Sequence, residues 1–169
     1  LSLGGGSLWT ANEEALTNDG PLSTTSAGSW VRLQRFDGSA VANGQWGYLT
    51  DPISAMTFLT TAERSGVADV LALPTGGLLV LEREFGGSFI PNFRSRLYEV
   101  DFTGASDTAV VGDLSLGGFS AVSKNLLWEG DFSSANFEGI TLGPMLDNGN
   151  LSLLLISDNG GIPSSVPAL

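Results

Sequence analysis

The fold is decided by Asn136-Phe-Glu-Gly-Ile-Thr-Leu-Gly-Pro144, a turn at Asp147-Asn-Gly-Asn150, and Leu151-Ser-Leu-Leu-Leu-Ile-Ser-Asp158. The first part is apolar and extended, and the Asp, Asn and Gly residues tolerate the positive φ angles of a tight turn. The last part is too short for a buried helix and is typical of a buried strand. The stretch therefore predicts a β-hairpin with an acid at each open end, Glu138 and Asp158.

Short apolar runs between Gly, Asn, Asp and Pro residues continue along the rest of the chain and predict an all-β protein. Further strands are expected at 8–13, 30–36, 45–49, 69–73, 78–84, 96–102, 108–114 and 120–128. One short helix is expected between Asp51 and Arg64. Asp51 can cap it, Pro52 suits its first turn, and Gly66 lies beyond its end.

Two kinds of strand recur in the same order. Leu8-Trp-Thr-Ala-Asn-Glu13 matches Leu78-Leu-Val-Leu-Glu-Arg83, which starts 70 residues later, and Leu153-Leu-Leu-Ile-Ser-Asp158, a further 75 residues on. Arg32–Asp37 matches Arg96–Asp101 in the same way. A repeat of this size, with four short strands and long connections, indicates blades of a β-propeller. The alternative is that the strands are alike only because any β protein contains apolar strands.

The repeat divides the chain into approximate units 1–64, 65–135 and 136–169, which amount to between two and three four-stranded blades. A propeller closes with about 4–8 blades. The sequence therefore predicts an incomplete β-propeller, part of a single domain, that is completed by a segment outside this sequence or by a second chain. A free-standing β-sandwich of unrelated role is the other fold considered.

The composition excludes several kinds of chemistry. The chain has no His and no Cys, which removes Ser-His-Asp catalysis, thiolate nucleophiles and the usual zinc ligands. The net charge of −11 argues against a nucleic-acid partner and favours either calcium binding or simple solubility. No apolar run reaches the roughly 20 residues of a membrane span.

Seven stretches, taken in order, resemble one known family. They are 8–16, 31–37, 68–83, 96–101, 122–124, 136–140 and 153–159. The family is the bacterial one called esterase-like activity of phytase, a family of secreted β-propellers. The resemblance implies hydrolysis of carboxylic or phosphate esters in the periplasm or outside the cell, with a small ester as the partner molecule.

The residues proposed for catalysis are Glu138, Arg83 and Lys124. Glu138 precedes Gly139, which is expected to let the backbone turn beside the carboxylate. Arg83 can bind a phosphate or carboxylate through two N–H groups, and Lys124 can stabilise developing negative charge. The structural alternatives are a carboxylate that caps backbone N–H groups, an arginine paired with neighbouring acids, and a solvated lysine.

Acids at the strand ends suggest a calcium site, because calcium takes about 6–8 oxygen ligands. The candidate ligands are Glu13, Asp69, Glu138 and Asp158, with Asp69 expected in the place that Glu138 takes one unit later. The sequence thus predicts a metal-assisted hydrolase in which a calcium-bound water attacks the ester. The rival prediction is a non-catalytic propeller that binds a ligand or a protein, alone or by self-association.

Overall fold

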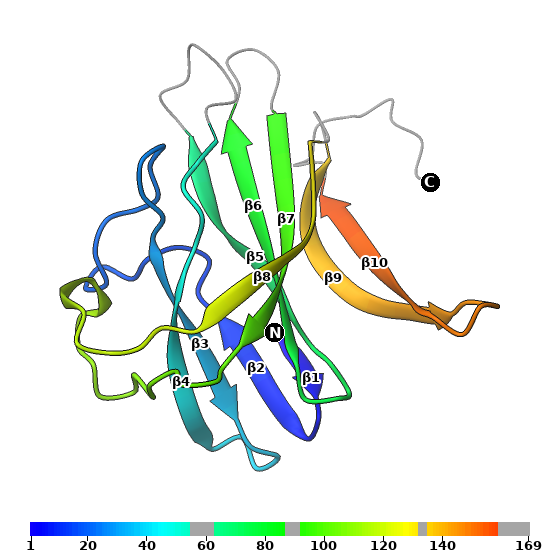
Figure 1. The fold of residues 1–169 in the computed structure, drawn as a ribbon, viewed down its shortest axis with the longest axis horizontal. Coiled ribbons are helices and arrows are strands. Elements are labelled where there is room, and N and C mark those ends of the chain that lie inside the picture. Colours follow the sequence, from blue (N-terminus) through cyan, green and yellow to red (C-terminus); the bar gives the residue numbers. More distant parts are fainter. Residues whose placement is uncertain (55–62, 87–91, 132–134, 159–169) are drawn as a thin grey trace.

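The computed structural model describes residues 1–54, 63–86, 92–131 and 135–158 (Figure 1). Within these ranges it contains one short 3₁₀ helix, Leu114–Leu116, and ten strands. The strands are β1 (Ser2–Gly4), β2 (Ser7–Ala11), β3 (Trp30–Phe36), β4 (Ala42–Leu49), β5 (Arg64–Ala72), β6 (Leu78–Gly86), β7 (Asn92–Asp101), β8 (Ser123–Asp131), β9 (Asn136–Met145) and β10 (Leu151–Asp158). The chain is therefore all-β, as the sequence predicts.

Antiparallel pairing arranges the strands into three sheets. Sheet 1 contains β1 to β4, sheet 2 contains β5 to β8, and sheet 3 contains β9 and β10. Strands follow one another in chain order within each sheet, so neighbouring strands are joined without crossing over. Figure 1 shows sheet 2 in the centre, sheet 1 below and to its left, and the β9–β10 hairpin to its right.

Sheet 2 is covered on both faces. Toward sheet 1 its Val70, Ala72, Leu78 and Val80 pack in one buried cluster with residues of sheet 1. Those sheet 1 residues are Trp9, Val31, Leu33 and Tyr48. Toward sheet 3, a second cluster joins Leu71, Leu79, Leu81 and Leu97 to Ile140 of β9.

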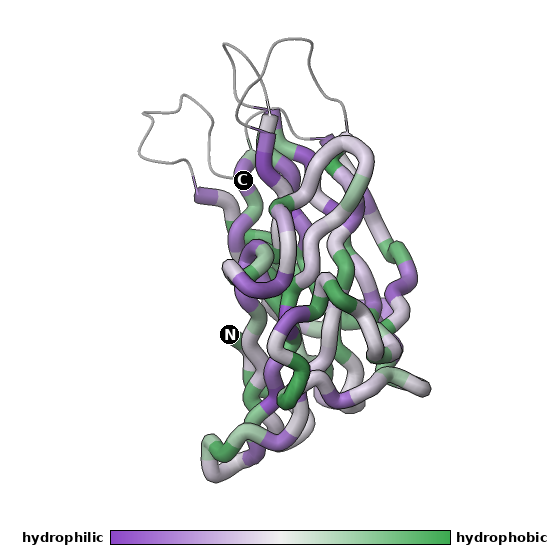
Figure 2. Tube along the Cα trace, turned by 90° about the vertical axis from the view of Figure 1, so that its left-hand side faces the viewer, coloured by the Kyte–Doolittle hydropathy of each residue, from purple (hydrophilic) through white to green (hydrophobic). Residues whose placement is uncertain are grey.

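Strand β6 contributes side chains to both hydrophobic clusters, one on each face of sheet 2. Side chains alternate along a strand, so Leu78 and Val80 reach the first cluster whereas Leu79 and Leu81 reach the second. All four side chains are buried. A strand apolar on both faces is typical of a sheet between two layers, and Figure 2 shows the hydrophobic segments gathered along the middle of the fold.

The repeated sequence segments occupy equivalent strands. The three segments of the first kind form β2, β6 and β10, and each of these is the second strand of its sheet. The two segments of the second kind form β3 and β7, the third strands of sheets 1 and 2. The order that repeats in the sequence is therefore the order of strands within each sheet.

The hairpin prediction for residues 136–158 is confirmed. Strands β9 and β10 pair in antiparallel register, with Asp158 opposite Asn136. The turn closes through backbone bonds from the N–H of Leu146 to the carbonyl of Asn150 (2.7 Å) and from the N–H of Gly149 to the carbonyl of Leu146 (2.9 Å). Gly149 has φ of 83°, which a side chain would strain. Both open ends thus lie at one end of sheet 3.

The strand predicted at 108–114 is wrong, because tertiary contacts hold this stretch as a loop against sheet 1. Val110 is 95% exposed, and the N–H of Thr108 bonds to the carbonyl of Gln45 at 2.7 Å. Phe119, further along the same connection, packs edge-on against Trp30. The helix predicted from Asp51 is not present in residues 51–54, and Arg64 begins β5; residues 55–62 lie outside the described part of the chain.

A buried ion pair fastens this loop to sheet 1. Arg32 on β3 donates through Nε and Nη2 to the two carboxylate oxygens of Asp19, each at 2.6 Å. Its remaining N–H groups reach Gln45 Oε1 and the carbonyls of Thr108 and Val111. The bonds from Arg32 hold the pKa of Asp19 below its ordinary value, against the opposing effect of burial. Since every Arg32 N–H has an acceptor, the pair is structural.

The first strands of the three sheets face a common groove. The groove has a volume of about 420 Å³. It is lined by residues 2–4 of β1, 70–72 of β5 and 140–142 of β9, among others. The carboxylate of Asp69 on β5 bridges the strands there, accepting a bond from the N–H of Ile140 on β9 at 3.0 Å. The sheets therefore converge along their first strands.

Candidate active site

The polar candidates lie where β6 changes from apolar to charged side chains. After Leu81, the strand continues as Glu82, Arg83 and Glu84. Alternation places Glu82 and Glu84 on the side of sheet 1 and Arg83 on the side of sheet 3. Each layer between the sheets is thus apolar at one end and ionic at the other.

Arg83 lies at the centre of a cluster drawn from all three sheets. Its Nη1 donates to Glu138 Oε1 at 2.7 Å and to Asn136 Oδ1 at 2.8 Å, both on β9. Its Nη2 donates to Oε1 of Glu13, which follows β2 of sheet 1, at 2.5 Å. The amide of Asn136 also donates to Glu138 Oε1 at 2.6 Å. We call Glu13, Arg83, Asn136 and Glu138 the Arg83 cluster.

The Arg83 cluster opens to solvent through its acids. The side chain of Arg83 is 17% exposed, whereas those of Glu13 and Glu138 are 56% and 45% exposed. The sheets cover most of the Arg83 side chain, whereas the carboxylates of Glu13 and Glu138 are in contact with solvent. The part of the cluster that a solute meets first is therefore its two carboxylates, with the guanidinium behind them.

A β-bulge directs Glu138 toward Arg83. Phe137 pairs with Ser157 and Gly139 pairs with Ile156, so Glu138 is an extra residue on β9. Bulges re-aim side chains and are common beside functional sites. Gly139 continues the extended strand opposite Ile156, so the bulge, and not the turn expected at Gly139, positions the carboxylate.

Sheet 2 has the same bulge, and its position shows that the predicted equivalence of Asp69 with Glu138 is wrong. Val67 pairs with Glu82 and Asp69 pairs with Leu81, which leaves Ala68 as the extra residue of β5. The counterpart of Glu138 is therefore Ala68 and not Asp69. Asp69 lies apart from the Arg83 cluster, where its carboxylate binds the backbone N–H groups of Val70 and Ile140.

The backbone of Asp158 lies next to the Arg83 cluster. It is the residue of β10 directly opposite Asn136, which donates to Glu138. Three of the four candidate metal ligands, Glu13, Glu138 and Asp158, thus belong to one end of the sheets. Asp69 instead links β5 to β9 through its bond from Ile140.

The arrangement does not suit a calcium ion. The guanidinium of Arg83 fills the space between the carboxylates of Glu13 and Glu138, and a cation there would have to displace it. Among the described residues, no three Asp or Glu side chains gather as a metal-binding group. Calcium binding remains a prediction that the geometry of these residues does not support.

The structure accordingly predicts that calcium leaves the stability of the chain unchanged. The melting temperature in 1–5 mM calcium should equal that in excess chelator within about 1 °C, because a ligand stabilises only a state that binds it. Differential scanning calorimetry measures both. A higher melting temperature in calcium that is lost in Glu138→Ala, but kept in the exposed-loop variant Asp107→Ala, would instead support the metal site.

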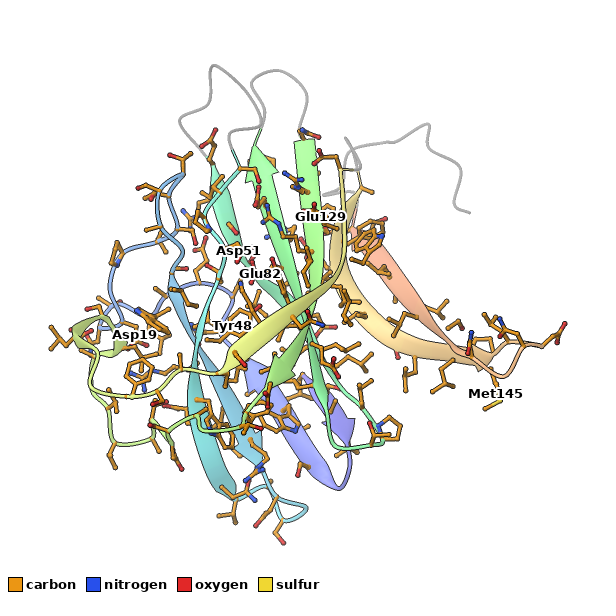
Figure 3. The ribbon with its side chains drawn as sticks, in the orientation of Figure 1. Asp19, Tyr48, Asp51, Glu82, Glu129 and Met145 are labelled. Carbon is orange, nitrogen blue, oxygen red and sulfur yellow. The ribbon has the colours of Figure 1, made fainter. Side chains whose placement is uncertain are left out.

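Lys124 is held in a second cluster on the opposite face of sheet 2. Its ammonium on β8 lies 2.6 Å from Glu82 Oε1 and 2.7 Å from Asp51 Oδ1. It also lies 4.9 Å and 4.2 Å from the ring centres of Tyr48 and Tyr98, which suits cation–π attraction. Figure 3 shows Tyr48, Asp51 and Glu82 together between sheets 1 and 2. We call Tyr48, Asp51, Glu82, Tyr98 and Lys124 the Lys124 cluster.

Both tyrosines of the Lys124 cluster donate to its acids. The hydroxyl of Tyr48 donates to Glu82 Oε1 at 2.6 Å, and that of Tyr98 donates to Asp51 Oδ2 at 2.5 Å. Burial, with the negative charge of the nearby acids, raises the pKa of both phenols. Burial alone would raise the pKa of Asp51, but bonds from Lys124 and Tyr98 outweigh it and the pKa is lowered.

An adjoining ion pair extends the Lys124 cluster along the same face. Glu84 is fully buried and is bound by the guanidinium of Arg96 on β7. Ser54 donates its N–H to Glu84 Oε2 at 3.0 Å, and its hydroxyl accepts a bond from Arg96 Nη2 at 2.7 Å. Ser54, which follows β4, is thereby bound to sheet 2.

The structure therefore joins two of the three proposed catalytic residues. Arg83 and Glu138 are in contact, whereas Lys124 lies across sheet 2, in contact with Glu82. Sequence reasoning missed Tyr48, Asp51 and Tyr98 as its partners. A signal was present in Glu82 and Glu84, because two acids on one face of an otherwise apolar buried strand require cationic partners.

Comparisons with known proteins bear on the family. A family model described as "Phytase-like: Esterase-like activity of phytase" matches residues 1–161 of the chain. The search of curated proteins and the search of solved structures returned no match. In the described part of the chain, no helix has the length and apolar character needed to span a membrane. The chain belongs to the phytase-like family, whose description is "Esterase-like activity of phytase".

Proposed function

We propose that the chain is part of a hydrolase that cleaves phosphate or carboxylic esters at the Arg83 cluster. The observation that supports this is the contact of Arg83 with Glu138 on β9 and with Glu13, which follows β2, with both carboxylates open to solvent. Membership of the phytase-like family supports hydrolysis as the class of reaction.

In this proposal, Arg83 stabilises negative charge on the reacting ester. A guanidinium presents paired N–H donors that match the oxygens of a phosphate or of a tetrahedral intermediate. Arg83 is oriented by three side chains and buried at its stem, so it is fixed before the ester binds. Preorganised donors of this kind contribute about 10²–10³ in rate.

Glu138 acts as the general base. A carboxylate can take the proton of a water molecule that attacks the phosphorus or carbonyl carbon, with a contribution of about 10²–10⁴ in rate. Asn136 donates to Glu138 Oε1 and Arg83 donates to the same oxygen, which leaves Oε2 for that water. Glu13 holds the other side of the guanidinium.

The Lys124 cluster has a structural role in this proposal. Its ammonium is already bound by Glu82 and Asp51, and it lies across sheet 2 from Arg83. Moving Lys124 to an ester would leave the fully buried carboxylate of Glu82 without its cation, which would be costly, so Lys124 is not free to take part.

We further assign the sheets to blades of a β-propeller in a protein secreted to the periplasm or cell exterior. The support is the convergence of the first strands on one groove and the packing of each sheet on the next. In a propeller, the ionic ends of successive sheets lie around one opening, where the Arg83 cluster would face the substrate.

The test is the hydrolysis of an aryl phosphate and an aryl acetate by the wild type and by Arg83→Met. We expect kcat/KM to fall by about 10²–10³ because charge stabilisation is lost. Arg35→Met is the matched control, since Arg35 lies on β3 and binds Asn43 away from the cluster. It should retain activity within about twofold.

Two results would contradict the proposal. One is no turnover of either ester by the wild type; the other is equal activity of Arg83→Met and wild type. The second candidate function, a non-catalytic module that binds a ligand or a protein, would then be preferred. The observation in its favour is that the cations of both clusters are already paired with acids of the same chain.

A further inference from the structure

Glu13 is held against Arg83 by its backbone as well as by its side chain. The carbonyl of Glu13 accepts a bond from the N–H of Val67 on β5 at 2.8 Å. Gly66, which lies opposite Arg83 on that strand, allows this approach, because a Cβ at its position would overlap the carbonyl oxygen of Glu13. The carboxylate of Glu13 is therefore in place at the guanidinium before any substrate binds.

The side chains around Arg83 take up most of its hydrogen-bonding capacity. A guanidinium has five N–H groups. Three of them donate to Glu13, Asn136 and Glu138, at 2.5, 2.8 and 2.7 Å. The Nε–H group is buried and has no partner among the described residues. At most two N–H groups therefore remain for a substrate, which suits one developing oxyanion better than the three acceptor oxygens of a phosphate.

The charges around Arg83 also disfavour an anionic substrate. Glu14, the residue after Glu13, binds Arg64 through both of its carboxylate oxygens. The bonds from Glu14, together with the nearby charge of Glu13, raise the pKa of Arg64. The two cations are thus matched by three carboxylates, those of Glu13, Glu14 and Glu138, before an ester arrives. A substrate that brings its own negative charge is repelled here, whereas an uncharged ester is not.

We propose that Glu13 is the specificity-determining residue of the Arg83 cluster and that it selects uncharged carboxylic esters over anionic ones. This inference rests on the proposed hydrolysis at the cluster and names its substrate class. A phosphate monoester carries a charge of about −1.5 to −2 at pH 7. It would have to displace a carboxylate to reach the guanidinium, whereas an uncharged ester leaves the pairs of Arg83 with both acids intact.

With an uncharged ester, negative charge reaches Arg83 only during the reaction. Glu138 takes a proton from the water that adds to the carbonyl carbon, and the carbonyl oxygen becomes the oxyanion beside Arg83. As the C–O bond breaks, Glu138 returns the proton to the alcohol oxygen, so the products are a carboxylic acid and an alcohol. The remaining N–H groups of Arg83 thus stabilise the transition state more than the ground state.

A matched pair of substrates tests the proposal. An aryl methyl adipate is uncharged, whereas the aryl hydrogen adipate has the same leaving group and carries one carboxylate remote from the reacting ester. For the wild type in 10 mM salt, we expect kcat/KM to be at least about tenfold higher for the uncharged ester. The ratio should fall to about threefold or less in 0.5 M salt, because salt screens exposed charges.

Three variants separate a specificity role of Glu13 from a structural one. Glu13→Gln keeps the size of the side chain and removes its charge, so the ratio between the two esters should fall at least about threefold. Gly66→Ala, which displaces the backbone of Glu13, should lower the ratio in the same direction. Glu99→Gln is the matched control, because Glu99 is exposed on β7, four residues beyond the Ser95 that lies opposite Arg83. It should leave the ratio unchanged, and a purely structural role of Glu13 would slow both esters equally.

The results distinguish this inference from the function on which it rests. If the wild type turns over neither adipate and no aryl phosphate, the proposed hydrolysis is wrong, and this inference is wrong with it. If the wild type is active but prefers the hydrogen adipate or an aryl phosphate, selection by charge is wrong and hydrolysis stands. A ratio that Glu13→Gln leaves unchanged would likewise overturn the role of Glu13 alone.

Discussion

Replacing Arg96 by leucine is expected to lower the free energy of unfolding by about 3–5 kcal/mol. Arg96 is the cation that neutralises Glu84, whose side chain is fully buried. Without it, the donors left to this carboxylate among the described residues would be the N–H and hydroxyl of Ser54, at 3.0 and 3.3 Å. An unpaired buried charge is among the most destabilising changes that one substitution can make.

Urea unfolding at pH 7 measures this effect. Arg94→Leu is the matched control, because Arg94 precedes Arg96 on the same face of β7, is 27% exposed and binds the half-exposed Glu129. It should cost about 1 kcal/mol or less. The double variant Arg96→Leu/Glu84→Leu should recover part of the loss, since a buried ion pair exchanged for apolar groups is often tolerated. Equal losses in Arg96→Leu and Arg94→Leu would show that the pair is not a main support of the fold.

Replacing Asp19 by asparagine is expected to cost about 3 kcal/mol at pH 7, and the cost should shrink in acid. Arg32 holds the folded pKa of Asp19 below the ordinary value of 3.8. A carboxyl group whose pKa is depressed by folding stabilises the protein above its unfolded pKa. That stabilisation is lost as the pH falls through the lower, folded value.

The difference in unfolding free energy between the wild type and Asp19→Asn should thus be complete at pH 5–7 and narrow once the pH falls below about 4. Urea titrations at pH 7, 5, 4 and 3 give this difference. Asp113→Asn is the control, since Asp113 lies in the loop that Asp19 and Arg32 hold and its carboxylate accepts bonds from Ser115. A gap that stays constant from pH 7 to pH 3 would contradict the assignment of the effect to the ionised pair.

Local chemistry made parts of the fold predictable from sequence. The hairpin follows from the residues at 147–150, which suit a tight turn, and from the apolar runs on either side. The repeated strands could be recognised because each occupies the same place in its sheet. The contact of Arg83 with Glu138 and Glu13 follows from that repeat, since equivalent strand ends come together at one end of the sheets.

Features that depend on distant contacts were not predictable. Residues 108–113 are apolar enough for a strand, but Arg32, 76 residues before Thr108, binds the backbone and holds it as a loop. The Lys124 cluster needs sheets 1 and 2 to be docked before Tyr48 meets Glu82. The equivalence of Asp69 with Glu138 failed by one residue because a bulge is invisible in a pattern of apolar side chains.

The most direct measurement is a double-mutant cycle on ester hydrolysis with Arg83→Met and Glu138→Gln. In the proposed function, these residues, from sheets 2 and 3, act as one site through their 2.7 Å contact. Groups that act as a unit show strongly non-additive losses in kcat/KM. We therefore predict that the double variant is about as slow as the slower single variant. Losses that multiply would show that the two residues act independently and would contradict a shared site at the meeting of the sheets.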